Sequence, residues 1–335
     1  MMSGDVVTEL RLAGDPETLL SHMALLGTGM ILEEQLGAGE VLCRWSESTD
    51  PAPLLHVRHV SDKEVDKIIR VHAARLAASE SFLRKSHDQV GSLFSARTKT
   101  PKDDAVWREV LDLRDETLVK LRGLNSQFVV GIGERAWWRK DPDDGASAWE
   151  MRPRNHGAEF IATTVLPLAE NVAQRSPGEV VLGLTGDHLD DELGNNERTS
   201  LTGTGLGPVG PTDNARAWVA LWAIACMPVW PQPCYKSQTS ASLPGRQGAR
   251  QQLLMPMCTS WVTVSRWRAT LRSQALLRIG DLATRDRRDS PLLQPLLDQL
   301  AAHGFGEVLR FPIDTSGGSG STRRHSMQGV RASTP

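Results

Sequence analysis

Two tryptophan-centred stretches decide the fold of the C-terminal part of the chain. The first covers residues 217–225, Ala-Trp-Val-Ala-Leu-Trp-Ala-Ile-Ala, and the second covers residues 261–272, Trp-Val-Thr-Val-Ser-Arg-Trp-Arg-Ala-Thr-Leu-Arg. In the first stretch, Trp218 and Trp222 share one helical face with Leu221, which predicts a helix with a buried face. Large aromatic side chains dominate protein cores, so we expect both indole rings there.

The second stretch interleaves indole rings with guanidinium groups, a combination that proteins use to hold nucleic-acid backbones and to stack on bases. Arg266 and Arg272 should project away from the buried face of this helix, with Arg268 at its border. An alternative is that the tryptophans are core residues and the arginines only carry their charge to water. The buried face of the predicted helix consists of Val264, Trp267, Leu271 and Ala275.

Charge is distributed unevenly along the 335 residues, although the formal net charge is only -2. From Asn214 onward the chain holds 14 Arg and one Lys against six acidic residues, whereas residues 1–213 hold 23 basic and 34 acidic residues. This split predicts an anionic partner for the C-terminal part, unless the two parts neutralise each other across an interface. The residues that we expect to contact phosphate are Lys236, Arg246, Arg250, Arg266, Arg268, Arg272, Arg323 and Arg324.

The N-terminal residues have the pattern of a mixed α/β fold. Residues 7–12 alternate as in a strand, and helical spacing follows from Leu19 to Met30. Residues 41–45 and 54–60 are predicted as two further strands. Ser61 with Glu64 forms a capping-box signature for a helix that runs to about Ser79.

Length and a 40% share of hydrophobic residues predict about two folded domains. We expect an α/β (α+β) N-terminal part and a mainly helical, tryptophan-rich C-terminal part. The predicted boundaries are an α/β domain over 1–192, a glycine-rich connector over 193–213, a basic helical domain over 214–315, and a disordered tail over 316–335.

Neither a membrane span nor a secretory signal is predicted, which makes the cytoplasm the expected location. The longest apolar run, residues 217–227, is too short to cross a bilayer and is followed by Pro228. Residues 1–7 lack a basic segment followed by an apolar one. The cysteines have no CxxC spacing, so they are predicted to be reduced, buried thiols: Cys43, Cys226, Cys234 and Cys258.

Candidate catalytic chemistry rests on one dipeptide, His87-Asp88, which metal-dependent phosphohydrolases use to bind ions that activate water. Three other histidines of the first half, His56, His59 and His72, precede it without a recognisable ligand spacing. The acidic run 187–192 has the donors for a hard cation but is better interpreted as a charged surface loop. Residues 203–207 are glycine-rich but lack the lysine of a P-loop, which favours a flexible connector. We therefore predict no enzyme activity, no metal and no cofactor.

Short motifs along most of the chain resemble CRISPR-associated proteins of type I systems, in particular the type I-G (formerly I-U) subfamily. That subfamily includes large-subunit-like proteins and a family described as an extension of the effector helicase-nuclease. The motifs that carry the resemblance are residues 10–16 with Leu19, Leu20 and 23–27, Asn155-His156-Gly157 with Phe160, Gly183-Leu184-Thr185-Gly186, Asp213-Asn214, Trp218 with Leu221-Trp222, Pro228-Val229, and Ser260-Trp261 with Trp267-Arg268 and 271–273.

The resemblance implies a role in antiviral interference, as a non-catalytic subunit of a guide-RNA surveillance complex. Such a subunit helps to hold foreign DNA or recruits the effector helicase-nuclease. The implied partners are guide RNA, target DNA and other type I subunits. Because the chain is shorter than typical large subunits, the resemblance assigns no base-reading residue.

Overall fold

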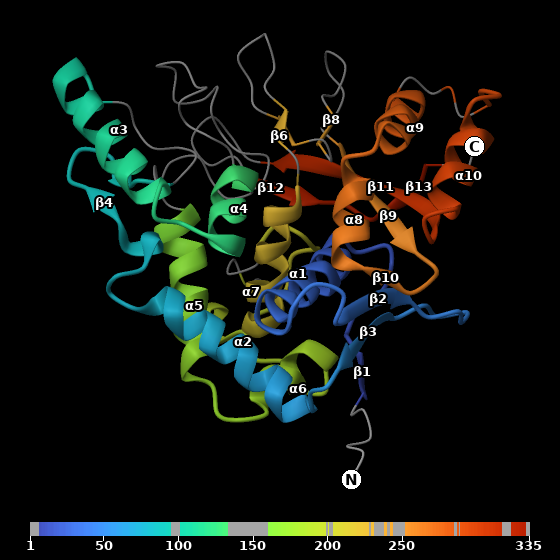
Figure 1. Ribbon diagram of the computed structural model, residues 1–335, viewed down its shortest axis with the longest axis horizontal. Coiled ribbons are helices and arrows are strands. Elements are labelled where there is room, and N and C mark those ends of the chain that lie inside the picture. Colours follow the sequence, from blue (N-terminus) through green and yellow to red (C-terminus); the bar gives the residue numbers. More distant parts are fainter. Residues whose placement is uncertain are drawn as a thin grey trace.

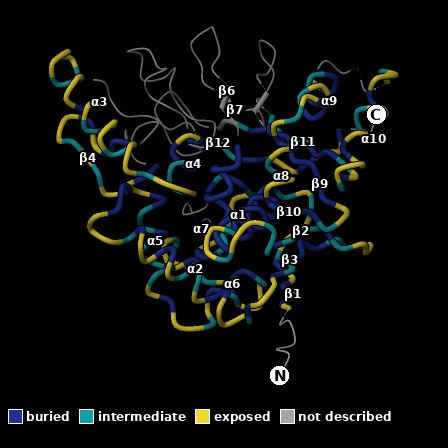
Figure 2. The backbone as a smooth tube through the Cα atoms, in the orientation of Figure 1, coloured by how far each residue is buried: buried dark blue, intermediate teal, exposed yellow. Residues whose placement is uncertain are grey.

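Helix α1 (Leu19–Leu36) runs through the middle of the molecule, and its sequence explains why. A helix that is apolar on every side is stable only when it is surrounded by protein. Residues 19–32 of α1 are all buried, and they lie at the centre of the buried region in Figure 2. The computed structural model describes residues 7–94, 101–132, 160–198, 200, 204–227, 229–230, 238–239, 242–243, 252–284, 287, 289–316 and 323–332.

The first antiparallel sheet covers one side of α1. It has the strand order β1-β3-β2-β10, with β1 (Val7–Arg11), β3 (Pro53–Arg58), β2 (Val41–Trp45) and β10 (Val262–Thr263). The three N-terminal strands confirm the strand prediction to within two residues at each end. Strand β10 comes from the C-terminal part of the chain, and Val262 pairs with Cys43 at the edge of β2.

The second sheet is built from the C-terminal part in the order β12-β11-β9-β8. Its members are β8 (Ser242–Leu243), β9 (Gln252–Cys258), β11 (Phe305–Ser316) and β12 (Arg323–Ser326), while β13 (Val330–Arg331) pairs with β11 off this path. The expectation of a disordered tail over 316–335 is therefore wrong for residues 323–332. These residues pair with the free edge of β11, and Ala332 is fully buried.

The described part of the chain contains ten α-helices (Figure 1). They are α1, α2 (Asp62–Ala77), α3 (Asp104–Leu118), α4 (Gly123–Ile132), α5 (Leu166–Gln174), α6 (Glu179–Thr185), α7 (Asn214–Trp222), α8 (Val264–Leu271), α9 (Gln274–Thr284) and α10 (Leu293–Ala301). Short hairpins pair β4 (Ser86–His87) with β5 (Gly91–Ser92), and β6 (Val229–Trp230) with β7 (Gln238–Thr239).

Helix starts follow the capping signals of the sequence. Ser61 and Glu64 form the predicted capping box at the start of α2. Asp213 caps α7 by accepting hydrogen bonds from the backbone N–H groups of Ala215 and Arg216. These contacts satisfy backbone donors that a helix start leaves without an internal partner.

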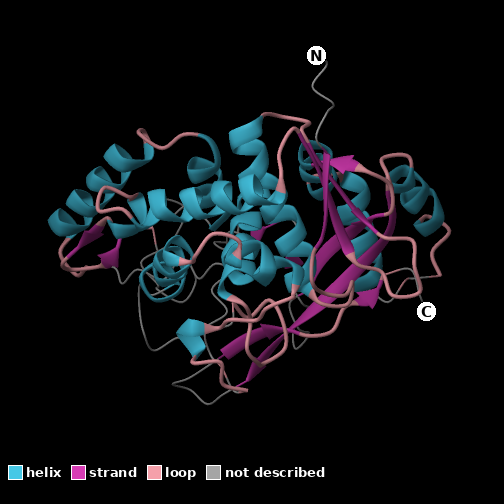
Figure 3. Cartoon of the chain, turned by 90° about the horizontal axis from the view of Figure 1, so that it is seen from below, coloured by secondary structure: helices cyan, strands magenta, loops and turns pink. Residues whose placement is uncertain are grey.

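Helices and antiparallel sheets are combined in an α+β arrangement, as the sequence predicted. Helices α2 to α6 gather on one side, the two larger sheets lie on the other, and α1 and α7 run between them (Figures 1 and 3). The C-terminal part contains strands as well as helices. Two glycines permit unusually close packing: a Cβ on Gly27 would overlap the carbonyl oxygen of Val219 on α7, and one on Gly131 would overlap that of Ile224.

The tryptophans of the first stretch are core residues, as predicted. Trp218 and Trp222 are fully buried and lie edge to face, with ring centroids 5.5 Å apart. They pack beside α1, so the helix that follows residues 193–213 shares a core with the helix near the N-terminus. The expected domains over 1–192 and 214–315 thus contribute side chains to one continuous core.

None of the helices in the described ranges is long and apolar enough to cross a membrane.

Candidate nucleic-acid interface

Helix α8 separates its tryptophan from its arginines. Thr263 caps the helix by accepting a hydrogen bond from Arg266 N. Trp267 is fully buried against the ring of Phe305, at a centroid distance of 6.2 Å. The predicted buried face is confirmed, because Val264, Leu271 and Ala275 are buried as well.

The arginines of α8 lie where helical spacing placed them. Arg266 and Arg272 are exposed, and Arg268 is half-buried. Trp267 is not accessible for base stacking. Trp261 is half-buried, and its ring is covered by the Arg44 guanidinium at 4.5 Å and lies edge-on to a histidine. The charge of α8 is therefore available to solvent, whereas its aromatic rings are used for packing.

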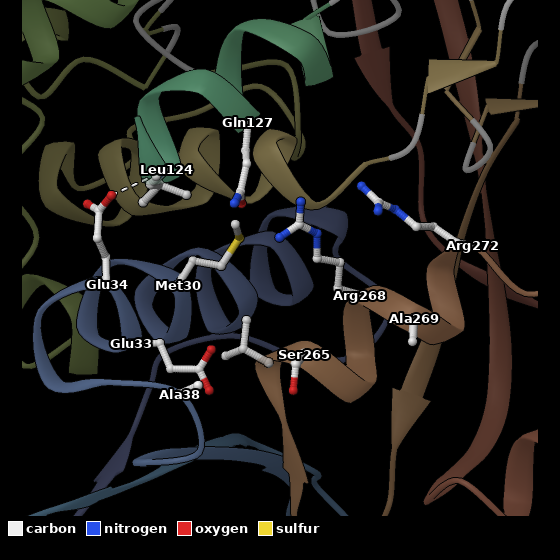
Figure 4. A pocket seen from close by; sticks show the side chains of 12 residues that line it. Met30, Glu33, Glu34, Ala38, Leu124, Gln127, Ser265, Arg268, Ala269 and Arg272 are labelled. Carbon is white, nitrogen blue, oxygen red and sulfur yellow. Dashed lines mark hydrogen bonds between the residues drawn. The ribbon is translucent and has the colours of Figure 1, made fainter. Parts of the chain in front are cut away.

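Arg268 and Arg272 enter a cavity of about 710 Å³ between α1, α4 and α8. Both guanidinium groups extend from α8 toward the side of the cavity where Gln127 of α4 lies, and Met30 of α1 lies between Arg268 and Glu34 (Figure 4). The lining residues are Met30, Glu33, Glu34, Ala38, Gly123, Leu124, Gln127, Val264, Ser265, Arg268, Ala269 and Arg272.

Positive charge at one end of this cavity lacks a partner among the described residues. Arg268 Nε is buried and donates no hydrogen bond to any residue within the described ranges. Partial burial lowers the pKa of Arg272, and the adjacent charge of Arg268 lowers it further. Two guanidinium groups held close together create a local excess of positive charge, which an anion would relieve.

The opposite end of the cavity is acidic, but its carboxylates are already engaged. Glu33 Oε1 accepts a hydrogen bond from Gly39 N at 2.9 Å, and Glu34 Oε1 accepts one from Leu124 N at 2.7 Å. Partial burial raises the pKa of Glu33. These bonds tie the end of α1 to the following loop and to the start of α4, and neither carboxylate forms an ion pair with Arg268 or Arg272 in the described part of the chain.

The structure brings together two of the eight predicted phosphate contacts, Arg268 and Arg272, and presents Arg266 on the same helix. Lys236, Arg246 and Arg250 lie outside the described residues. Arg323 and Arg324 belong to β12, where the backbone is described but the side chains are not. Sequence reasoning missed the acidic half of the cavity. Its one signal was the Glu-Glu pair that ends the apolar run of α1.

His87 and Asp88 lie in the β4–β5 hairpin. His87 Nε2 is 3.8 Å from Glu109 Oε1 on α3, and His87 Nδ1 accepts a hydrogen bond from Gln89 N. No group of three or more His, Cys, Asp or Glu side chains that could hold a metal ion occurs in the described part of the chain. The imidazole is thus engaged with a helix and a turn.

The acidic run 187–192 is only partly a surface loop. Asp191 is fully buried and accepts hydrogen bonds from Gly194 N and Thr212 N. Nearby, Asp213 Oδ1 accepts a hydrogen bond from Arg175 at 3.0 Å, and both side chains are buried. These buried carboxylates are satisfied by backbone donors and a guanidinium, which assigns them to holding the start of α7.

Three cysteines are buried free thiols, as predicted, and Cys234 lies outside the described residues. Burial raises the pKa of Cys226 to about 12, and its Sγ lies 3.0 Å from the sulfur of Met30. Because the thiolate is the reactive form, this thiol is chemically inert.

The comparisons with known proteins add no relative: no protein-family model matches the chain, and no curated protein sequence does so either.

Proposed function

We propose that this chain is a non-catalytic, cytoplasmic subunit of a type I CRISPR antiviral interference complex that binds nucleic-acid backbone through α8. Its proposed partners are guide RNA, target DNA, other type I subunits and the effector helicase-nuclease. The sequence motifs described above support the complex, and the geometry of α8 supports the binding activity.

The observation that carries the binding proposal is the separation of roles on α8. Trp267 is fully buried and fixes the helix on the sheet, while Arg266 and Arg272 are exposed and Arg268 enters an open cavity. Guanidinium groups match phosphate oxygens in geometry and remain charged at neutral pH. A rigid helix with three such groups and an anchored opposite face suits phosphate contacts better than base reading.

A binding titration with fluorescent DNA and RNA tests this proposal. The double substitution Arg266→Ala with Arg272→Ala should weaken binding to all sequences alike, because phosphate contacts carry no sequence information. Its thermal melting should stay close to that of the unsubstituted protein, since both side chains are exposed. Unchanged affinity in the double variant, or no binding at low salt, would contradict the proposal.

The non-catalytic role is tested with the purified protein, Mg²⁺, Mn²⁺ or Ni²⁺, and single- and double-stranded DNA and RNA. We expect no cleavage by the protein alone, and an effect on target binding or cleavage when the other CRISPR components are present. Cleavage that disappears in His87→Ala or Asp88→Ala would instead establish a metal-dependent nuclease.

A further inference from the structure

The cavity between α1, α4 and α8 has the size of a small-molecule site. Pockets that enclose small ligands have volumes of roughly 300–1,000 Å³, and this one measures about 710 Å³. A duplex cannot enter such a space, because its bases are stacked inside and its backbone follows the outer surface. One nucleotide that is free of pairing and stacking can enter it.

The side chains that line the cavity match the parts of a nucleotide: one end is positively charged, and the region next to it is apolar. Arg268 and Arg272 form one end, and their charge repels cations and attracts phosphate. Between the two ends, the apolar side chains of Met30, Leu124 and Val264 line the space. Such a surface suits the face of a base or a sugar better than it suits a second phosphate.

The acidic end of the cavity determines which way round a nucleotide would bind. Glu33 and Glu34 lie on the side away from Arg272 (Figure 4), and their charge disfavours a phosphate there. The amide of Gln127 points into the cavity between the two ends (Figure 4), where it can bond to the polar edge of a base. Amino groups on base edges are hydrogen-bond donors and are compatible with nearby carboxylates.

We infer that this cavity holds one unpaired nucleotide of a single-stranded nucleic acid, with its phosphate on Arg268 and Arg272 and its base toward Gln127 and the acidic end. The inference rests on the proposed function and narrows it to single strands or strand ends. Arg266 remains outside the cavity and contacts backbone of either form.

The test compares affinity for an unstructured oligodeoxycytidylate at neutral pH, whose bases carry an exocyclic amino group, with affinity for a duplex of equal length. The unsubstituted protein should prefer the single strand. Arg268→Gln with Arg272→Gln should lower single-strand affinity by about tenfold or more, because charge-assisted hydrogen bonds are lost, and should remove the preference. Arg266→Gln is the matched control on the same helix, and it should lower affinity for both forms by the same factor.

A second variant fills the cavity and keeps its charges. Ser265→Leu with Ala269→Leu changes two exposed lining residues of α8 to a good helix former. It should retain duplex binding and lose the single-strand preference. Should this variant fail to fold, competition on the unsubstituted protein replaces it. A nucleoside 5′-monophosphate should then displace the single strand at concentrations where inorganic phosphate does not.

The outcomes separate the two proposals. Absence of binding to either form overturns the proposed function. Binding of both forms with equal affinity, a filled variant that keeps its preference, or equal competition by phosphate and mononucleotide overturns the nucleotide site and leaves backbone binding by α8 intact. If a 5′-phosphate on the single strand does not change its affinity, the cavity holds an internal nucleotide. If the 5′-phosphate raises the affinity, the cavity holds the nucleotide at the strand end.

Discussion

At the scale of single residues, helical geometry explains how one segment serves both packing and charge. Trp267 and Arg268 are adjacent in sequence, but their side chains leave a helix about 100° apart, so one is buried and the other faces the cavity. The spacing of apolar residues was sufficient to predict this division. It could not predict which charged residues of α1 complete the cavity, because that depends on how distant helices cross.

Substitution of the buried indole tests the packing role of α8. Trp267→Ala should lower the free energy of unfolding by about 3–5 kcal/mol, because it leaves a cavity where a large aromatic side chain was packed. Denaturant titration measures the loss. Arg266→Ala is the control from the neighbouring position, with an expected change within about 0.5 kcal/mol. A stable Trp267→Ala protein that loses nucleic-acid binding would reverse the two roles.

Two buried histidines predict that acid destabilises the fold. Burial lowers the pKa of His22 to about 4 and that of His72 to about 3, so both stay neutral in the folded state near pH 5. In the unfolded chain both histidines have the ordinary pKa of 6.5, so the unfolded chain binds more protons than the folded state below that pH. Stability falls as pH drops through this range.

His72→Phe measures this effect at one site. His72 packs edge to face on Trp222, with ring centroids 4.6 Å apart, and an aromatic ring fills the same space. Between about pH 7.5 and pH 5 the unsubstituted protein should lose about 2 kcal/mol more than His72→Phe does. The control variant His188→Gln changes an exposed histidine, and it should lose as much stability over this pH range as the unsubstituted protein does. Equal pH dependence in His72→Phe and the unsubstituted protein would contradict the assignment.

At the scale of elements, local signals predicted the N-terminal strands and helix starts well. Residues 7–11 alternate buried and exposed, and the Ser61 capping box is present as expected. The second sheet was not predicted, because β11 pairs with β9 across a long intervening segment and β12 has a polar sequence. Residues 323–332 are ordered by backbone pairing with β11, which leaves no signal in local composition.

The crossing of α1 and α7 depends on a residue without a side chain. Gly27→Ala should destabilise the protein by about 1–3 kcal/mol or more, since its Cβ would overlap the backbone of Val219 and force the two helices apart. Thermal or denaturant unfolding measures this loss. Gly207→Ala is the matched control, because a Cβ there meets only ordinary van der Waals contacts. A fully stable Gly27→Ala protein would refute the close crossing.

At the scale of the whole molecule, residues from both halves build the core and the cavity. Strand β10 extends the N-terminal sheet, and the cavity takes Glu33 from α1 and Arg268 from α8. The basic C-terminal part and the acidic N-terminal part thus meet at this site. The charge split was visible in the sequence, but the meeting point follows from packing between segments more than 200 residues apart.

Shared packing predicts that a fragment of residues 1–192 does not fold by itself. It would lack α7, whose fully buried Trp218 and Trp222 pack beside α1, and the face of α1 that α7 covers would be exposed to water. Circular dichroism and amide-proton dispersion of the fragment check this, and co-expression with residues 193–335 should restore a folded protein. A cooperatively folded fragment would establish the 1–192 domain.

The salt dependence of single-strand affinity tests the central claim, phosphate binding by α8, most directly. The slope of log K against log salt falls by about 0.7 for each lost phosphate contact to a single strand. Arg266→Gln with Arg268→Gln and Arg272→Gln should therefore reduce the slope by about 2. The control Arg11→Gln with Arg58→Gln and Lys63→Gln removes the same charge from exposed N-terminal positions and should leave the slope nearly unchanged. Equal slopes in both variants would contradict phosphate binding by α8.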